Sequence, residues 1–596
     1  MWNHFVLLLF LCFDPTCLAP YLAEASCSSQ IETARAVSSE MGEDAANKSG
    51  IHQWAKINYR NSERDVHSVA GQQRTRLDIP IAEINVQNTR LPWISPKAWF
   101  QYIVNHGLLY MLSGLHYEEK HLVGTTWKKN WTQYQPLNSD LEVFYMEGLN
   151  WERTIGLYIH GDEGRTLKRG GLMVTSLQSV LGFGFNRNRL KRPHGSDDTG
   201  KLQVNFAGHT FLTRFVVSVL PKTEYQSNPD YFHETMDIFA RELKDLLESG
   251  ITDPVTGEVW RFAVIGIKGD MSYLQKVGKL KRSWNTTVKR GRQRTAPRGV
   301  CHLCLAGTQN TPFEDTSEGA RWVQTIGVQA PWDTMPNIVR LLPYPKSHPG
   351  SFLQPDLWHS IHLGVGKSLI ASTLQIALEV VPATNNEDRF EWLTNHYYSW
   401  CRSVKVSSHI SKISAYLVSY GDGPGATGNW SKGALTTNLA RWLIPLIDDL
   451  AVDSHNFLPR CKEAAQQLNA ALTFLYNAPL FLEGVESRYV SERGTFFVRT
   501  YTALATECFH LQRPHLFPLF PKIHAVQHTW LTLKNESATH GYGMNPLTAS
   551  CQLDEDTIGR VSRVSRRVNV RLVVLRTLQR HLMSSWNIWM DAGVLR

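Results

Sequence analysis

The sequence predicts an α/β protein in which a β-β-β-α-β core is interrupted by a large all-α insertion. Three observations predict this class. Three short apolar runs precede one amphipathic helix, a nearly continuous apolar run follows that helix, and residues 366–535 show mostly helical spacing. At 596 residues the chain exceeds the size of a single hydrophobic core, so a second structural unit is expected.

Residues 1–90 are expected to form a polar, disordered leader with an apolar start, because residues 28–80 are rich in Ser, Glu, Arg and Gln and poor in aromatic side chains. The apolar start at 5–13 has the length of a signal-peptide core and is too short to span a bilayer. A misassigned first exon, or an N-terminal segment that is buried in the folded protein, would show the same apolar pattern as a signal peptide. Residues 91–150 are predicted to form a helical, Trp-rich region that opens with a helix capped by Ser95.

Residues 151–300 are predicted to hold the first part of the core. The predicted elements are strands at 154–160, 170–181 and 209–220, a helix at 230–249 and a strand at 259–267. The first three strands follow one another closely, which indicates an antiparallel meander. The last is apolar on both faces, as in a central buried strand.

Three acidic residues are the predicted catalytic and metal-binding groups. Asp162 ends the first apolar run, Asp270 ends the fourth, and Glu555 opens a long Arg-rich segment. Acids at these places in a β-β-β-α-β order match the layout of a ribonuclease-H-like core. Two Mg²⁺ or Mn²⁺ ions that assist phosphoryl transfer need carboxylate ligands grouped in this way.

Each acid also has a simpler interpretation. Asp162 lies in Gly-Asp-Glu-Gly, which is typical of a turn, and Asp270 could cap the helix that follows it. Glu555 could complement the positive end of a helix dipole. Residues 536–596 are predicted to hold the final core helix with the third acid, and this helix is expected to start near Asp556 because apolar residues recur over 561–582 at spacings of 3 and 4.

Residues 301–365 contain two short motifs. Cys301 and Cys304 form a Cys-x-x-Cys pair that could supply two ligands of a Zn²⁺ site, although a structural site needs four; buried or free thiols are the alternative. The histidines considered as partners are His302, His348, His359 and His362. Asp356, His359 and His362 share a helical face at spacings of 3, so they could shape the acidic site from behind its metal ligands, or form a helix cap and ordinary core contacts.

The net charge of +9 is concentrated in two acid-free stretches, 271–312 and 557–590, which favours a polyanionic partner. Solvated surface or a nuclear-localisation signal is the alternative. The predicted nucleic-acid-binding residues are Lys276, Lys279, Lys281, Arg282, Lys289, Arg290, Arg292, Arg294, Arg560, Arg563, Arg566 and Arg567.

Several segments resemble the DDE/DDD transposases of cut-and-paste DNA transposons, most closely the CACTA-type (En/Spm-like) group and more distantly the hAT-type group. The resemblance is carried by VWRFAVIGIKGD with the later VCHLC, by PDLWHSIHLGVGK, and by FPKIHAVQH with EDTIGRVSRVSRR. It covers residues 151–582 in patches. It implies a nuclear, metal-dependent DNA nuclease and strand transferase that acts on double-stranded DNA at transposon ends. Such an enzyme works as a homo-oligomer without a small-molecule cofactor.

Two other functions remain open from the sequence. A degenerate or domesticated copy would bind nucleic acid without catalysis. A secreted or luminal glycoprotein is the second alternative, based on the apolar start and five Asn-x-Ser/Thr sequons.

Overall fold

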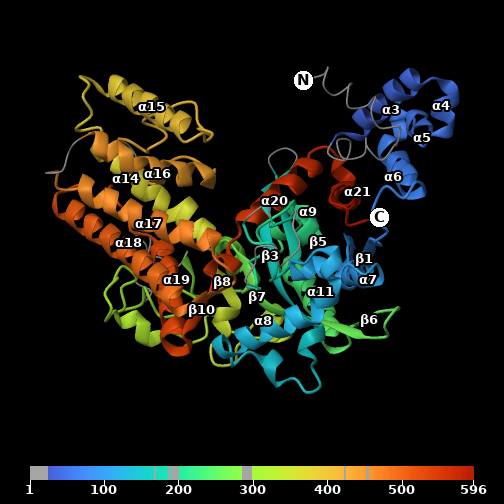
Figure 1. Ribbon diagram of the computed structural model, residues 1–596, viewed down its shortest axis with the longest axis horizontal. Coiled ribbons are helices and arrows are strands. Elements are labelled where there is room, and N and C mark those ends of the chain that lie inside the picture. Colours follow the sequence, from blue (N-terminus) through green and yellow to red (C-terminus); the bar gives the residue numbers. More distant parts are fainter. Residues whose placement is uncertain are drawn as a thin grey trace.

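The computed structural model describes residues 25–166, 170–185, 189–190, 200–284, 298–421, 425–450 and 455–595. A mixed sheet lies at its centre with helices around it, so the chain is a mixed α/β protein as predicted (Figure 1). The strands of this sheet are β3 (Thr154–Arg165), β4 (Gly171–Ser179), β5 (Arg214–Pro221), β6 (Ile251–Thr252), β7 (Val259–Gly269) and β8 (Leu353–Pro355). Their order across the sheet is β5-β4-β3-β7-β6, and β8 also pairs with β7.

The strands of the core follow the predicted sequence of elements. β3, β4 and β5 form an antiparallel meander, α11 (Pro229–Glu248) follows, and β7 returns parallel to β3. β5 begins five residues later than predicted because His209 caps the short helix α9 (Thr210–Thr213). β8 is parallel to β7. The carboxyl ends of β3, β7 and β8 therefore meet at one edge of the sheet, where open α/β sheets place their functional groups.

Helices cover both faces of the sheet. Side chains alternate between the faces along β3, so Gly161 and Gly164 lie on opposite sides. Gly161 faces Tyr273 of α12 (Met271–Val277), whereas Gly164 faces Ser562 of α20 (Gln552–Ser565). α7 (Pro96–Asn105) and α8 (Val123–Leu137) complete this packing, and the Ser95 hydroxyl accepts a hydrogen bond from the Lys97 amide at 3.1 Å, which confirms the predicted cap.

The N-terminal region is folded within the described residues, and the prediction of a disordered leader is wrong there. It forms α3 (Cys27–Met41), α4 (Glu43–Lys48), α5 (Ile51–Ala55) and α6 (Ser62–Gln72). Ile31, Val66 and Ala70 are buried together with Met583 of α21 (Val573–Asp591). The segment needs few apolar residues because α21 supplies part of its core. The apolar start at 5–13 lies outside the described residues.

A short hairpin joins this unit to the core. It consists of β1 (Ala82–Val86) and β2 (Thr89–Trp93), which the sequence interpretation missed. Gln87 and Asn88 both adopt left-handed backbone angles, with φ of 46° and 66°. Two such residues form the tight turn that matches the twist of a hairpin.

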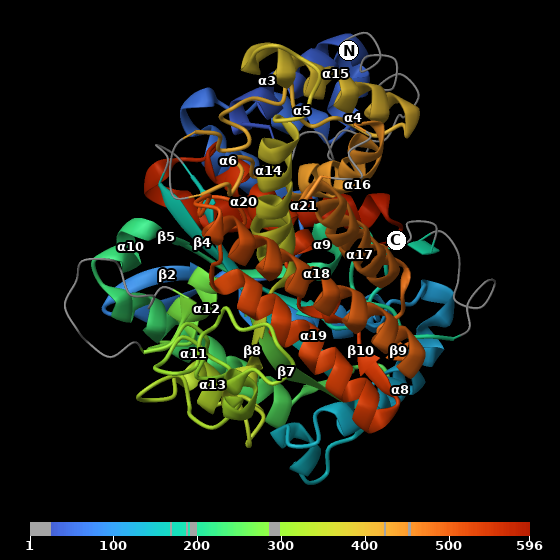
Figure 2. The same cartoon turned by 90° about the vertical axis from the view of Figure 1, so that its left-hand side faces the viewer.

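The predicted helical insertion is present and extends slightly beyond its predicted bounds. It contains α14 (Gly366–Ala377), α15 (Asn386–Ser403), α16 (Gly433–Asp449), α17 (Leu458–Asn477), α18 (Gly484–His510) and α19 (Pro521–His540). A π-helix, η12 (Trp358–Val365), leads into it from β8. α17, α18 and α19 pack side by side (Figure 2). No described helix is both long enough and apolar enough to cross a membrane.

The Arg-rich C-terminal segment forms two helices rather than one. α20 ends at Ser565, a single turn (Val570–Leu572) follows, and α21 begins at Val573. Among the apolar residues that recur at spacings of 3 and 4, Val561 and Val564 are buried, whereas Leu572 is exposed because it lies in the turn between the two helices. α20 also begins earlier than predicted, so Glu555 lies in its first turn.

Candidate functional site

Asp162 and Glu555, two of the three predicted acids, meet at the carboxyl edge of the sheet together with His359. One possible ligand atom from each of these three side chains lies within 4.8 Å of the other two. Asp162 is paired with Val174 inside the β3–β4 ladder, so it does not form a turn. Glu555 comes from the first turn of α20, and His359 comes from η12. Three segments far apart in the sequence thus build one group, here called the acidic cluster.

Asp270 borders the acidic cluster but is not a member of it. Its carboxylate accepts a hydrogen bond from the Tyr273 amide at 2.6 Å, so it caps α12, as the simpler interpretation predicts. Burial and the charge of Asp270 both raise the pKa of Asp162. The two carboxylates are therefore close enough to interact.

Burial and neighbouring negative charges disfavour the ionised form of both carboxylates in the acidic cluster. Burial, followed by the charge of Asp162, raises the pKa of Glu555 to about 9. At neutral pH Glu555 therefore retains a proton that an exposed glutamic acid would release. A divalent cation among these oxygens would reverse this effect and favour both ionised carboxylates. The carboxylate oxygens and one imidazole nitrogen of the cluster could hold such an ion.

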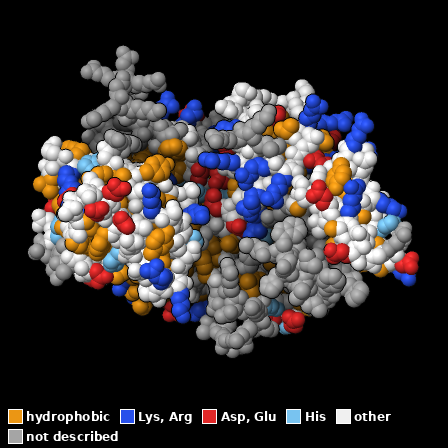
Figure 3. Space-filling view, turned by 90° about the horizontal axis from the view of Figure 1, so that it is seen from above, with side chains coloured by type: hydrophobic (Ala, Val, Ile, Leu, Met, Phe, Trp, Pro, Cys, Tyr) orange, Lys and Arg blue, Asp and Glu red, His pale blue; other side chains and the backbone are white. Residues whose placement is uncertain are grey.

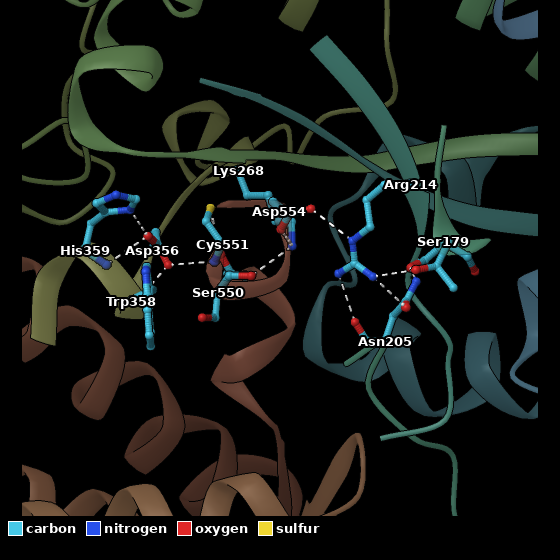
Figure 4. A network of polar contacts seen from close by, with 12 residues as sticks. Ser179, Asn205, Arg214, Lys268, Asp356, Trp358, His359, Ser550, Cys551 and Asp554 are labelled. Atoms are coloured by element: carbon cyan, nitrogen blue, oxygen red, sulfur yellow. Dashed lines mark hydrogen bonds and ion pairs between the residues drawn. The ribbon is translucent and has the colours of Figure 1, made fainter. Parts of the chain in front are cut away.

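Asp356 holds His359 in place beside Glu555. Its carboxylate accepts hydrogen bonds from His359 Nδ1 at 2.6 Å and from the Trp358 and Cys551 amides at 2.8 Å and 2.9 Å (Figure 4). Burial acts to lower the pKa of His359, but the hydrogen bond to Asp356 and the nearby carboxylates raise it to about 9. The protonated imidazole lies with its Nε2 3.6 Å from Glu555 Oε1. Asp356 thus orients His359 and also ties η12 to the start of α20.

His362, which shares the predicted face with Asp356 and His359, has a structural role. Its buried ring lies on Trp358 with the ring centres 4.5 Å apart, and burial lowers its pKa to about 4. It therefore packs within the helical insertion rather than in the acidic cluster.

A buried ion-pair network fixes the first turn of α20 against the sheet. Asp554 accepts from Arg214 Nε at 3.1 Å and from Lys268 Nζ at 2.8 Å, and Lys268 also donates to the Ser550 carbonyl at 3.0 Å (Figure 4). Burial opposes ionisation of Asp554, but the two cations hold its pKa below the usual range. Because β5 and β7 supply these cations, the network sets the position of Glu555, the next residue. His160 and Cys551 bring possible ligand atoms close to Asp554, but this carboxylate is already paired with two cations.

Gly164 determines how closely α20 approaches β3. A Cβ atom at this position would overlap Ser562 Oγ and meet Ile558 at 3.0 Å. Gly164→Val should therefore push α20 away from the sheet, lower the melting temperature and weaken any metal binding at the acidic cluster. Thermal unfolding with and without Mn²⁺ checks this, with Gly319→Ala, at an exposed turn where no atom lies within 4 Å, as the control. An unchanged metal response in a folded Gly164→Val protein would contradict the expected coupling.

A second cluster, here called the Cys/His cluster, contains Cys301, Cys304, His524 and His528. All four side chains are buried, and their ligand atoms lie within 4.8 Å of one another. Cys304 Sγ is 3.2 Å from His524 Nε2 and 3.3 Å from His528 Nε2, and the two Nε2 atoms are 3.1 Å apart. Four nitrogen and sulfur atoms that converge in this way could hold a metal ion.

The predicted histidine partners of the two cysteines were wrong. His302 Nε2 contacts the Leu353 carbonyl at 2.7 Å, and His348 Nε2 contacts the Leu303 carbonyl at 3.1 Å. The correct pair, His524 and His528, lies one turn apart on α19. Their spacing of four residues on one helix face was the signal in the sequence that could have identified them.

The predicted nucleic-acid-binding residues divide into four groups. Arg282 is buried and donates to the Cys301 carbonyl at 2.7 Å, so it supports the Cys/His cluster instead of facing solvent. Lys276 donates to Glu163 at 2.7 Å, while Lys279 and Lys281 are exposed and Lys281 pairs with Asp333 at 3.2 Å. The residues outside the described part of the chain are Lys289, Arg290, Arg292 and Arg294.

The fourth group lies on or just after α20 and is here called the arginine row. Its members are Arg560, Arg563, Arg566 and Arg567. They continue along the helix that carries Glu555, and Arg560 pairs with Asp556 at 2.7 Å. Lys and Arg side chains gather beside Asp and Glu side chains near the centre of the face in Figure 3. Positively charged side chains therefore lie along and just after the helix that carries Glu555, one of the predicted catalytic residues.

Neither a family model nor a curated protein matches the chain.

Proposed function

We propose that this protein is a metal-dependent DNA-cleaving and strand-transferring enzyme with a ribonuclease-H-like core, related to cut-and-paste transposases. The observation that carries the proposal is the meeting of Asp162 and Glu555 in one group beside Asp270. The strand order, with three antiparallel strands followed by parallel β7 and β8, supports the fold assignment. The resemblance of the motifs around the three acids supports the assignment to transposases.

The donor set of the acidic cluster fits Mg²⁺ or Mn²⁺. These ions prefer oxygen ligands, and the cluster supplies carboxylates whose ionisation burial and neighbouring negative charges disfavour, which a bound cation would offset. Asp162 and Glu555 would hold the metal, and Asp270 would join them. When bound, a metal pair activates the attacking oxygen and stabilises the leaving oxygen in phosphoryl transfer. His359, oriented by Asp356, can hold or release a proton beside these carboxylates.

The substrate is proposed to be double-stranded DNA. Arg560 and Arg563 lie three residues apart on one side of α20, and Arg567 follows just after the helix ends, so positive side chains continue along the chain from the acidic cluster. Guanidinium groups in such a row suit the phosphates of a nucleic-acid backbone.

Nicking of supercoiled plasmid tests the proposed function, because it needs no knowledge of a preferred sequence. The full-length protein should nick the plasmid with Mn²⁺ or Mg²⁺, and Asp162→Asn should abolish nicking. Asp556→Asn is the matched control, since this neighbouring carboxylate pairs with Arg560 outside the acidic cluster. DNA binding with steep salt dependence but no nicking by the wild-type protein would favour a non-catalytic, transposon-derived binding protein.

We further propose that the Cys/His cluster binds a structural Zn²⁺ ion. Tetrahedral zinc with bonds of about 2.05 Å to nitrogen and 2.3 Å to sulfur separates two nitrogens by about 3.4 Å and a sulfur from a nitrogen by about 3.6 Å. The observed separations, 3.1 Å and 3.2–3.5 Å, are close to these values. Trp322 packs against both imidazoles, with ring-centre distances of 4.5 Å and 4.9 Å, and closes the site.

A further inference from the structure

A groove of about 540 Å³ lies where the N-terminal helices meet α21. Its lining includes Arg64, His67 and Gly71 of α6, Arg76 from the segment after α6, and Arg576 of α21. Three guanidinium groups therefore converge from parts of the chain that only the fold brings together. The acidic cluster and the Cys/His cluster lie elsewhere, so neither explains this concentration of positive charge.

Nearby acids compensate only part of the positive charge. Arg64 pairs with Asp65 at 2.8 Å. Glu63 lies 3.8 Å from Arg576 Nε and also accepts a hydrogen bond from the Asn569 amide at 2.6 Å. Arg76 has no carboxylate partner within the described part of the chain. The groove thus retains unbalanced positive charge that favours an anion.

His67 provides independent evidence for a missing ligand. The side chain is buried, with 3% exposure, yet neither ring nitrogen has a hydrogen-bond partner among the described residues. Buried polar groups in folded proteins almost always find a partner. Burial, together with the charges of Arg580, Arg576 and Arg76, lowers the pKa of His67 well below its usual value. The neutral ring has one N–H to donate, and an oxyanion in the groove could accept it.

Gly71 makes room for Arg76 at the wall of the groove. A Cβ atom on Gly71 would come within 3.2 Å of the Arg76 Nη2 atom, so the guanidinium lies directly on the helix backbone. This close approach fixes Arg76 beside His67 instead of leaving it extended into solvent.

We propose that this groove binds a phosphate group of a nucleic-acid backbone. The choice of nucleic acid rests on the proposed function and on the position of the groove. The hydrogen bond from the Asn569 amide to Glu63 attaches α6 to the connection between α20 and α21, where the arginine row ends. From Glu555 to Arg566 α20 rises about 16 Å at 1.5 Å per residue. A duplex that runs along α20 would advance by roughly five base steps, at about 3.4 Å each, over that distance.

DNA binding by Arg76→Ala tests this site. Binding is measured without Mn²⁺ or Mg²⁺, so that the DNA is not nicked. The full-length protein, a 30-bp duplex and a series of salt concentrations are used, with Arg60→Ala as the control, because exposed Arg60 belongs to the same unit but does not line the groove. Loss of one phosphate contact should weaken binding roughly eightfold at 0.1 M salt and reduce the salt slope by about 0.9. Arg76→Lys should retain most of the slope because it keeps the charge.

The arms of this experiment separate the possible ligands. Equal DNA binding by wild type, Arg76→Ala and Arg60→Ala would overturn the site and leave the proposed function intact. Stabilisation of wild type but not Arg76→Ala by inorganic phosphate, without any effect on DNA binding, would overturn the nucleic-acid assignment in favour of a free phosphate. Failure of the wild-type protein to bind any duplex would instead contradict the proposed function and, with it, this choice of ligand.

Discussion

Glu555→Gln is expected to abolish metal-dependent cleavage and, at the same time, to stabilise the metal-free protein. Loss of one carboxylate ligand removes several kcal/mol of transition-state stabilisation, which corresponds to a decrease in rate on the order of 10³-fold. Without metal, however, the same change removes a carboxyl group whose ionised form is disfavoured by burial and by the charge of Asp162. The melting temperature should then rise by about 2 °C, as for a stabilisation of about 1 kcal/mol in a large domain.

The stabilisation should depend on pH in a defined direction. The pKa of Glu555 is about 9 in the folded protein, compared with about 4.5 for an ordinary glutamic acid. Between these values the unfolded chain has released a proton that the folded protein retains, so the free energy of unfolding falls as pH rises. The melting temperature of the wild-type protein without added divalent ions should therefore decrease more steeply between pH 5 and 9 than that of Glu555→Gln.

Asp556→Asn provides the control for both effects. It changes a neighbouring carboxylate in the same helical turn, but this residue pairs with Arg560 and accepts a hydrogen bond from Thr210 at 3.0 Å. It should retain cleavage and the pH profile of the wild-type protein. Mn²⁺ should raise the melting temperature of wild type and of Asp556→Asn but not of Glu555→Gln. A Glu555→Gln protein that still cleaves DNA would remove Glu555 from the site.

Replacement of Cys304 by Ser, or of His528 by Ala, is expected to cause the largest loss of stability. Structural zinc contributes most of the folding free energy of small zinc domains, so its loss should lower the free energy of unfolding by several kcal/mol here. Metal analysis of the purified wild-type protein should find about one zinc per chain, and either variant should contain little. Because Lys522 of α19 donates to the Leu363 carbonyl at 3.0 Å, displacement of α19 should also disturb η12 and reduce cleavage.

Cys508→Ser is the matched control for the Cys/His cluster. Cys508 is likewise buried and free, but it lies in α18, outside the cluster. Its replacement should cost about 1 kcal/mol and leave the zinc content unchanged. Wild-type protein without zinc, or a Cys304→Ser variant no less stable than Cys508→Ser, would contradict a structural zinc site.

Local patterns predicted most of the core because each element there carries its own periodic signal. The apolar runs became β3, β4 and β7, and the amphipathic spacing became α11. β3 continued through Gly-Asp-Glu-Gly because its ladder with β4 pairs Asp162 with Val174, and a turn pattern carries no information about such a partner. For the same reason the N-terminal helices were missed, since α21 completes their core.

The site was only partly predictable because its members are brought together by long-range packing. The sequence indicated Asp162, Asp270 and Glu555 separately, but their proximity depends on Gly164 and on the ion pairs of Asp554 with Arg214 and Lys268.

Other functional assignments depended on contacts that no spacing reveals. Arg282 looked like part of a basic surface, yet its guanidinium is buried under the Cys/His cluster. His524 and His528 complete that cluster from a helix more than two hundred residues after the cysteines. Asn130, one of the sequons behind the glycoprotein alternative, is buried inside α8 and could not accept a glycan in the folded protein.

The most direct test of the proposed metal centre is anomalous diffraction from crystals of the full-length protein soaked in Mn²⁺. We expect a manganese peak about 2.1 Å from carboxylate oxygens of both Asp162 and Glu555, with Asp270 turned toward it. Saturating Mn²⁺ that leaves these carboxylates without a peak, and Glu555 still beside the His359 ring, would contradict a metal-dependent enzyme at this site.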